Sequence, residues 1–85
     1  MIFVDKLTTY PQRPFGHQHW CHLWTDGDLA ELHVFAEALG LKRRWFQDKH
    51  LLPHYDLVPG KRLLALQKGA HEASLFDWLR ERVRP

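Results

Sequence analysis

A strand pattern followed at once by a helix pattern is the feature that most constrains how this chain can fold. Trp20, His22 and Trp24 alternate with Cys21 and Leu23. Because strand side chains point alternately to the two faces, we expect His22 and the tryptophans on one face and Cys21 and Leu23 on the other. A fold that contains both strands and helices follows from this order.

The helix pattern begins at Asp26 or Asp28, either of which can cap a helix N-terminus. Glu31 follows Asp28 at the spacing of a capping box, and Gly40 stands where a left-handed residue closes a helix. The apolar residues between them form one stripe at helical spacing: Leu29, Leu32, Phe35, Ala36 and Leu39. An amphipathic helix is therefore expected between Asp28 and Gly40.

Further strands are expected before the strand at residues 20–24 and after the helix that ends at Gly40. Residues 1–4 form an apolar run that ends at Asp5, which is typical of a buried strand with a carboxylate at its end. Residues 44–47 are interpreted as a strand after the helix. A strand, helix, strand connection normally lays its two strands parallel, through a right-handed crossover. Residues 8–19 contain Pro and Gly without periodicity and are expected to form a loop.

Two more helices are expected in the C-terminal part of the chain. Pro59 suits the first turn of a helix that runs through residues 61–68 and is closed by a glycine. Ser74 and Asp77 make a second capping box, which begins the last helix. Together the patterns predict a small single α/β domain over residues 1–85, with a short, mostly parallel sheet and three helices.

Composition narrows the class of protein. Of the 85 residues, 45% are hydrophobic and 26% are charged, a globular balance that argues against a disordered regulator or a fibrous protein. No apolar run approaches the roughly 18 residues that cross a bilayer, so no membrane partner is expected. The single cysteine, Cys21, cannot form an intrachain disulfide, which argues against a secreted disulfide scaffold and favours a cytoplasmic location.

Acidic and imidazole side chains suggest a divalent metal site. The candidate ligands are Asp5, His22, Asp26, His54 and Asp56. These groups suit zinc, manganese or iron, whereas magnesium favours the carboxylates alone. We expect the opening strand and the tryptophan-flanked strand to run in the same direction, which brings Asp5 and Asp26 to one rim of the sheet. An ion there would support a phosphodiesterase with Asp5, Asp26, Asp56 and His22 as catalytic residues and His54 assisting.

Structural roles compete with these assignments. Asp26 is a common type of helix start. His33 lies at the margin of the apolar stripe and is interpreted as a hydrogen-bonded, half-buried histidine. His22 either packs between its two tryptophan neighbours or lines a pocket with them. Cys21 is expected to be a buried thiol rather than a nucleophile paired with His22, because adjacent strand residues point to opposite faces.

Basic residues cluster beside aromatic ones and suggest an anionic partner. The candidate anion-binding residues are Lys42, Arg43, Arg44, Lys61, Arg62 and Tyr55. Basic groups attract phosphates and the neighbouring Trp45 and Phe46 can stack on bases, so nucleic acid or a nucleotide is the expected partner. The alternative is a solvated basic turn with Trp45 and Phe46 in the core.

Six short strings together resemble one known family. They are Ile-Phe-Val-Asp at 2–5, Trp-Cys-His-Leu at 20–23, Glu-Leu-His-Val-Phe-Ala at 31–36, Arg-Trp-Phe-Gln at 44–47, His-Tyr-Asp at 54–56 and Lys-Arg at 61–62. In this combination, from residue 2 to about residue 70, the chain resembles the domain of unknown function 4031 family, a set of small bacterial and phage proteins. The resemblance implies a short protein of that kind and supplies no activity.

Three functions of different classes remain open. The first is binding of an anionic ligand, nucleic acid or a nucleotide, in a crevice at the carboxyl ends of the strands. The second is a metal-dependent phosphodiesterase or nuclease. The third is a phage accessory protein that acts by protein contact, with a homodimer formed through Trp78 and the last helix.

Overall fold

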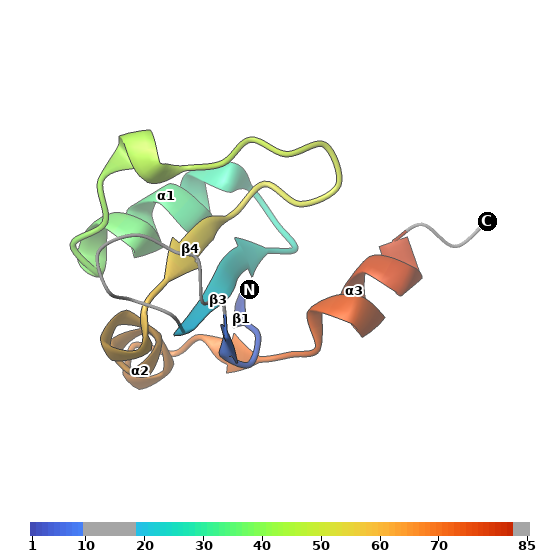
Figure 1. The fold of residues 1–85 in the computed structure, drawn as a ribbon. Helices are drawn as coiled ribbons and strands as arrows, with labels where there is room; N and C mark the ends of the chain where they lie inside the picture. The colour runs from blue at the N-terminus through green and yellow to red at the C-terminus, as the bar shows by residue number, and fades with distance from the viewer. Residues whose placement is uncertain (10–18, 83–85) are drawn as a thin grey trace.

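A mixed sheet of five strands and three α-helices make up the fold in this computed structural model, which describes residues 1–9 and 19–82 (Figure 1). The strands are β1 (Ile2–Val4), β2 (Thr8–Thr9), β3 (His19–Thr25), β4 (Tyr55–Leu57) and β5 (His71–Glu72). Strand β3 pairs antiparallel with β1, β2 and β4, and the parallel pair is β1 with β5. The predicted α/β class is confirmed, but the expectation of a mostly parallel sheet is wrong.

The direction of β1 is the source of this error. Ile2 lies opposite Thr25 and Val4 lies opposite Leu23, so β1 and β3 run in opposite directions. Alternating hydrophobicity fixes which face of a strand is buried, but it is the same for either direction of the strand. The expectation that Asp5 and Asp26 meet at one rim is therefore wrong as well.

The strand expected at residues 44–47 is also absent from the described part of the chain. Arg43–Trp45 form a 3₁₀-helix, η1, and Gln47 makes only an isolated antiparallel bridge with His54. A short run of mixed aromatic and basic residues does not by itself distinguish a strand from a helical turn. The chain consequently returns to the sheet through β4, which lies antiparallel to β3.

Strands β1 and β2 both pair with β3, and the residues between them break the regular pairing. Val4 lies opposite Leu23 and Thr8 lies opposite Trp20, so residues 5–7 stand against only residues 21–22. This two-against-three count is that of a β-bulge, which bends a strand and redirects its side chains. Part of the segment expected to be a loop, residues 8–19, therefore belongs to the sheet, and residues 10–18 of that prediction lie outside the described residues.

Helix α1 (Leu29–Ala38) begins and ends where the sequence predicted. Asp28 caps it, because its Oδ1 accepts a hydrogen bond from the Ala30 N–H at 3.0 Å. Gly40 follows with a φ of 82°, a conformation that favours glycine. Glu31 does not complete the capping box, since its carboxylate instead pairs with the Met1 amino group at 2.9 Å.

The two later helices are confirmed too. Helix α2 (Pro59–Gln67) starts with its proline in the first turn and is followed by Gly69, whose φ is 105°. Helix α3 (Leu75–Arg82) is preceded by Ser74, whose Oγ accepts a hydrogen bond from the Asp77 N–H at 3.3 Å. None of the helices in the described ranges is long and apolar enough to cross a membrane.

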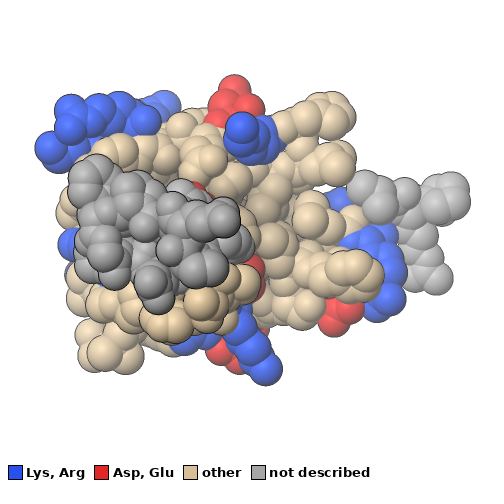
Figure 2. Space-filling model, viewed as in Figure 1, with Lys and Arg blue, Asp and Glu red and all other residues tan. Residues whose placement is uncertain are grey.

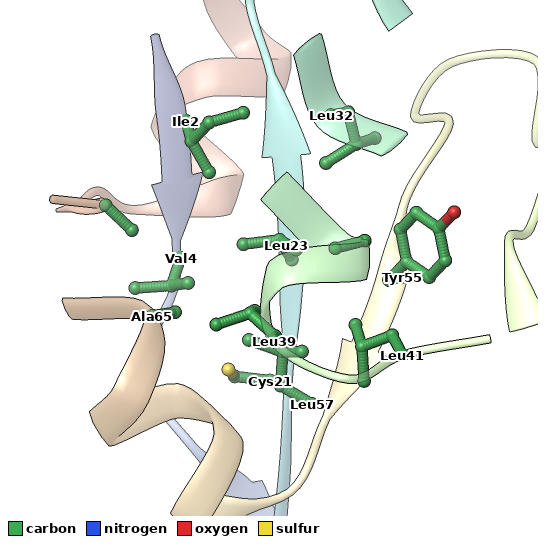
Figure 3. Packing of buried hydrophobic residues seen from close by; sticks show 12 residues of the cluster. Ile2, Val4, Cys21, Leu23, Leu32, Leu39, Leu41, Tyr55, Leu57 and Ala65 are labelled. Carbon is green, nitrogen blue, oxygen red and sulfur yellow. The ribbon is translucent and has the colours of Figure 1, made fainter. Parts of the chain in front are cut away.

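The hydrophobic core lies between one face of the sheet and helices α1 and α2 (Figure 3). Its buried members come from both layers: Ile2, Val4, Cys21, Leu23, Tyr55 and Leu57 from the strands, and Leu32, Ala36 and Ala65 from the helices, with Leu39 and Leu41 just beyond α1 and Ala70 beyond α2. Cys21 and Leu23 point into this core, as the alternation in β3 predicted. The opposite face of the sheet is therefore available for other roles.

Aromatic residues occupy one end of that opposite face. Trp24 is fully buried, and its ring stacks on Phe3 at 5.8 Å and meets Trp78 edge-on at 5.9 Å. Trp78 comes from α3, which projects away from α1 and α2 (Figure 1). The residue predicted to mediate a homodimer thus packs within its own chain, and dimerisation stays a prediction.

Candidate metal centre

Three neighbouring strands place acidic and imidazole side chains in one row on the face opposite the core. His22 lies opposite Asp56 in the β3–β4 pairing. Asp5 follows Val4, the residue opposite Leu23, at the point where the bulge begins. His54 precedes Asp56 by two residues and so falls on the same side of its strand. Four of the five predicted ligands therefore come together through cross-strand pairing.

Asp5 fixes the position and tautomer of His22. Its Oδ1 accepts a hydrogen bond from the His22 main-chain N–H at 2.6 Å, and its Oδ2 lies 2.9 Å from Nδ1 of the same residue. The two side chains are 13% and 24% exposed, so water competes weakly with these bonds. A carboxylate is an acceptor, so Nδ1 carries the proton and Nε2 keeps its lone pair.

His54 is oriented in the same manner by the main chain. Its Nδ1 lies 2.7 Å from the carbonyl oxygen of Leu52, which can only accept, so Nδ1 donates. Its Nε2 lies 3.3 Å from Oδ1 of Asp56. Burial disfavours the imidazolium, but the hydrogen bonds to Asp56 and the Leu52 carbonyl outweigh it and raise the pKa of His54. The position between Nε2 and Asp56 therefore attracts positive charge.

The ligand atoms of His22, His54 and Asp56 all lie within 4.8 Å of one another. Tetrahedral zinc holds such ligands at about 2.0–2.1 Å, which separates any two of them by roughly 3.3 Å. The observed 3.3 Å between His54 Nε2 and Asp56 Oδ1 equals that separation. The imidazoles of His22 and His54 meet edge-on at 5.0 Å between centroids, so the two rings and the Asp56 carboxylate form one compact group.

Gln47 supports the carboxylate of this group. Its Nε2 donates a hydrogen bond to Oδ2 of Asp56 at 2.7 Å, which holds the carboxylate while Oδ1 faces His54. Hydrogen-bonded partners of this kind orient metal ligands. Gln47 is not among the predicted site residues, because its link to this group is a bridge with His54 that forms only on folding.

Two of the predicted anion-binding residues are engaged within the chain. Arg62 donates from Nε to the Asp5 carbonyl oxygen at 2.9 Å and also pairs with Glu72, so it fastens the bulge to α2 and β5. Lys61 donates from Nζ to the carbonyl oxygen of Leu39 at 2.5 Å. Both cations therefore have structural bonds in addition to any role with a ligand.

Asp26 and Tyr55, two further predicted site residues, lie away from His22, His54 and Asp56. Asp26 pairs with the Met1 amino group at 3.0 Å, at the end of β1 opposite to Asp5. Tyr55 is buried on the core side (Figure 3). Its hydroxyl lies 2.9 Å from Nδ1 of His33. Burial raises the pKa of Tyr55 and lowers that of His33. The interpretation of His33 as a hydrogen-bonded core histidine is confirmed.

Cys21 takes no part in the candidate centre. It is 2% exposed and points to the core, on the face opposite His22. Burial and the nearby Asp5 charge raise the pKa of its thiol to about 12. The expectation of a buried thiol on the face opposite His22 is confirmed.

A basic and aromatic segment adjoins the centre. Lys42, Arg43 and Arg44 are exposed, and Figure 2 shows Lys and Arg side chains gathered at the corner where η1 lies. Trp45 is 47% exposed, so the alternative that placed it in the core is wrong, whereas Phe46 does pack against the core. A cavity of about 500 Å³ opens beside this segment and is lined by Trp20, Leu41, Trp45, Gln47, Asp56, Val58 and Lys61.

Comparison with known proteins gives one family. Among curated proteins and solved structures, no match to the chain was found. The family model described as protein of unknown function (DUF4031) matches residues 2–84, which extends the resemblance from about residue 70 through the last helix. The chain therefore belongs to the DUF4031 family.

Proposed function

We propose that the protein binds a divalent transition-metal ion through His22, His54 and Asp56 and uses it to hydrolyse a phosphoester. The observation that carries this proposal is the orientation of the two imidazoles. Each histidine donates from Nδ1, one to Asp5 and the other to the Leu52 carbonyl, which turns Nε2 of each ring toward the group. Histidine ligands to metals are almost always held in this way. An ion bound by His54 Nε2 would replace the proton that this nitrogen shares with Asp56.

The donor set favours a zinc-like ion over magnesium. Two imidazole nitrogens and one carboxylate oxygen are typical ligands of zinc, iron and manganese, whereas magnesium prefers oxygen ligands and retains several waters. The raised pKa of His54 means that a proton competes with the ion for Nε2, so metal binding should strengthen as the pH rises.

Three protein ligands support a catalytic rather than a structural ion. Within residues 1–9 and 19–82 the group consists of His22, His54 and Asp56, and three-ligand zinc sites usually keep a further position for water or substrate. A bound ion lowers the pKa of a water ligand and stabilises negative charge on phosphate oxygens. In the proposed reaction water attacks phosphorus, the ester P–O bond breaks, and the leaving alkoxide takes up a proton. The basic residues of η1 supply the positive surroundings that a phosphoester needs.

The test begins with binding of Zn²⁺ and Co²⁺ to the metal-free full chain. Isothermal titration should show saturable binding, and bound Co²⁺ should give visible absorption bands of a low-symmetry site. His54→Ala and His22→Gln should each weaken binding by more than the roughly 10–100-fold that loss of an outer partner causes. His71→Ala is the matched control, because His71 is exposed on β5 and outside the group.

Hydrolysis is then measured with bis(p-nitrophenyl) phosphate. Cleavage should require added Zn²⁺ or Mn²⁺, stop with a chelator, and be lost in His54→Ala but not in His71→Ala. Circular dichroism should show that the variants remain folded. Equal Zn²⁺ affinity of the wild type and both histidine variants would refute the metal site. Metal binding without metal-dependent cleavage would refute the hydrolytic function.

A further inference from the structure

We infer that the cavity between Trp20 and Trp45 binds the base of a nucleotide, so that the substrate class of the metal centre is nucleotides or single-stranded nucleic acid. This inference rests on the proposed function for its catalytic meaning, since it assigns the group that carries the phosphoester. The binding that it predicts is measurable without a metal ion.

The cavity has the size and the lining of a ligand site. Its volume of about 500 Å³ lies within the roughly 300–1,000 Å³ that is usual for small-molecule pockets. Two indoles, from β3 and from η1, contribute to its wall. Every base has a π-face that stacks on an aromatic side chain, and this contact tolerates different sequences.

The exposure of the Trp45 side chain is the strongest sign that the cavity binds an aromatic ligand. A tryptophan that is 47% exposed on a three-residue 3₁₀-helix contributes little to the core, and its neighbour Phe46 already fills that role. The Lys42 Nζ lies 5.7 Å from the centroid of the Trp45 ring. Arg43 and Arg44 follow directly, so positive charge surrounds an exposed aromatic surface.

The other end of the cavity is polar and belongs to the metal centre. Asp56 lines the cavity and also lies 3.3 Å from His54 Nε2. Gln47 donates its amide N–H to Asp56 and keeps a carbonyl oxygen that can accept a hydrogen bond from a base. A nucleotide whose base occupies the cavity therefore has its phosphate between a cationic segment and the proposed ion.

Charge distinguishes a nucleotide from a purely apolar ligand. Asp56 and Lys61 place charged groups on the wall of the cavity, which suits a ligand with polar edges better than a purely apolar one. An apolar ligand would also leave the three cations at residues 42–44 without an anion. A nucleotide matches both features, because it combines an aromatic ring with a phosphate and polar ring edges.

The experiment measures binding of adenosine 5′-monophosphate to the metal-free full chain, with a chelator present, by NMR titration and tryptophan fluorescence. Ribose 5-phosphate is the matched probe that lacks the base. Trp45→Ala should weaken the mononucleotide about 5- to 150-fold, the range for loss of one base stack, and Trp45→Phe should recover most of the affinity. Val34→Ala, on the exposed face of α1, is the control and should bind as the wild type does.

A second arm uses a single-stranded oligonucleotide of about ten residues, a length within known binding-site sizes. Tighter binding of the oligonucleotide than of the mononucleotide identifies a nucleic-acid strand as the source of the base, and the reverse identifies a free nucleotide. Both outcomes support the inference. Equal binding of the mononucleotide and ribose 5-phosphate, or an unchanged affinity in Trp45→Ala, would overturn it. Because no metal is present, failure here leaves the metal centre intact, and failure of the metal centre leaves this binding intact.

Discussion

Replacing Asp5 with Asn should weaken metal binding while leaving the fold in place. The carboxylate accepts two hydrogen bonds from His22, at 2.6 Å from the main-chain N–H and at 2.9 Å from Nδ1. An asparagine has one oxygen and one NH₂ group, so it can accept only one of these bonds. The main-chain N–H can only donate, so we expect it to keep its hydrogen bond to the asparagine oxygen. His22 Nδ1 then faces the NH₂ group.

The size of the effect follows from this geometry. In the variant, Nδ1 becomes an acceptor and the proton moves to Nε2, which removes the lone pair that would bind the ion. Metal binding then requires the original tautomer, in which two donors face each other in a part-buried position. A buried donor without an acceptor costs about 1–3 kcal/mol, or roughly 5- to 150-fold in affinity. Loss of an outer partner of a metal ligand typically costs about 10–100-fold, which agrees.

The assay compares Zn²⁺ affinity by competition with a chromophoric chelator, and the unfolding midpoint is measured for the metal-free proteins. Asp77→Asn is the control, because Asp77 is 63% exposed and pairs with Arg80 on the surface of α3. Zn²⁺ affinity in Asp5→Asn equal to that of the wild type, with an unchanged midpoint, would refute the reasoning about the tautomer. A large fall in the midpoint without added metal would show that Asp5 acts mainly on folding.

Three further outcomes are expected. Zn²⁺ at about 100 times its Kd should stabilise the wild type by about 2.7 kcal/mol, seen as a Tm increase of roughly 10–20 °C in a thermal melt, and His54→Ala should abolish the increase. Cys21, whose pKa is about 12, should react with a thiol-specific disulfide reagent only in denaturant, and rapid reaction of the native protein would contradict its burial. Burial lowers the pKa of His33, so the unfolded state takes up the proton first and stability should fall as the pH drops below 6.5. His33→Gln should show a smaller loss of stability than the wild type in urea melts over that range, and an identical loss would exclude His33 as a cause.

The helices could be predicted from the sequence because their signals are local. Asp28 and Gly40 mark the two ends of α1, and Ser74 marks the start of α3, through bonds that span only a few residues. The direction of β1 could not be predicted, since it depends on which strand lies beside it. The 3₁₀-helix at Arg43–Trp45 was missed because three residues are too few to show a period.

Most residues of the candidate site were selected from the sequence, but from a parallel arrangement of strands that the fold does not have. Asp5, His22 and Asp56 were expected at the tips of parallel strands, yet they meet across the middle of β3 because its neighbours are antiparallel. The alternation in β3 correctly placed His22 on the face away from the core. Asp26 was selected by residue type alone, and Gln47 was overlooked because a neutral amide beside Asp56 has no signature before the chain folds.

The bulge at residues 5–7 has a consequence for how the length of this chain can vary. Surface connections usually accept insertions and deletions at little cost. Here the extra residue lets the Asp5 side chain, in place of a main-chain carbonyl, receive the His22 N–H, while the Arg62 guanidinium clamps the Asp5 carbonyl. Removing one residue from this segment would make the pairing of β1 and β2 with β3 regular and withdraw the Asp5 carboxylate from the His22 imidazole. Sequences that keep the centre should therefore keep the spacing between Val4 and Thr8 unchanged.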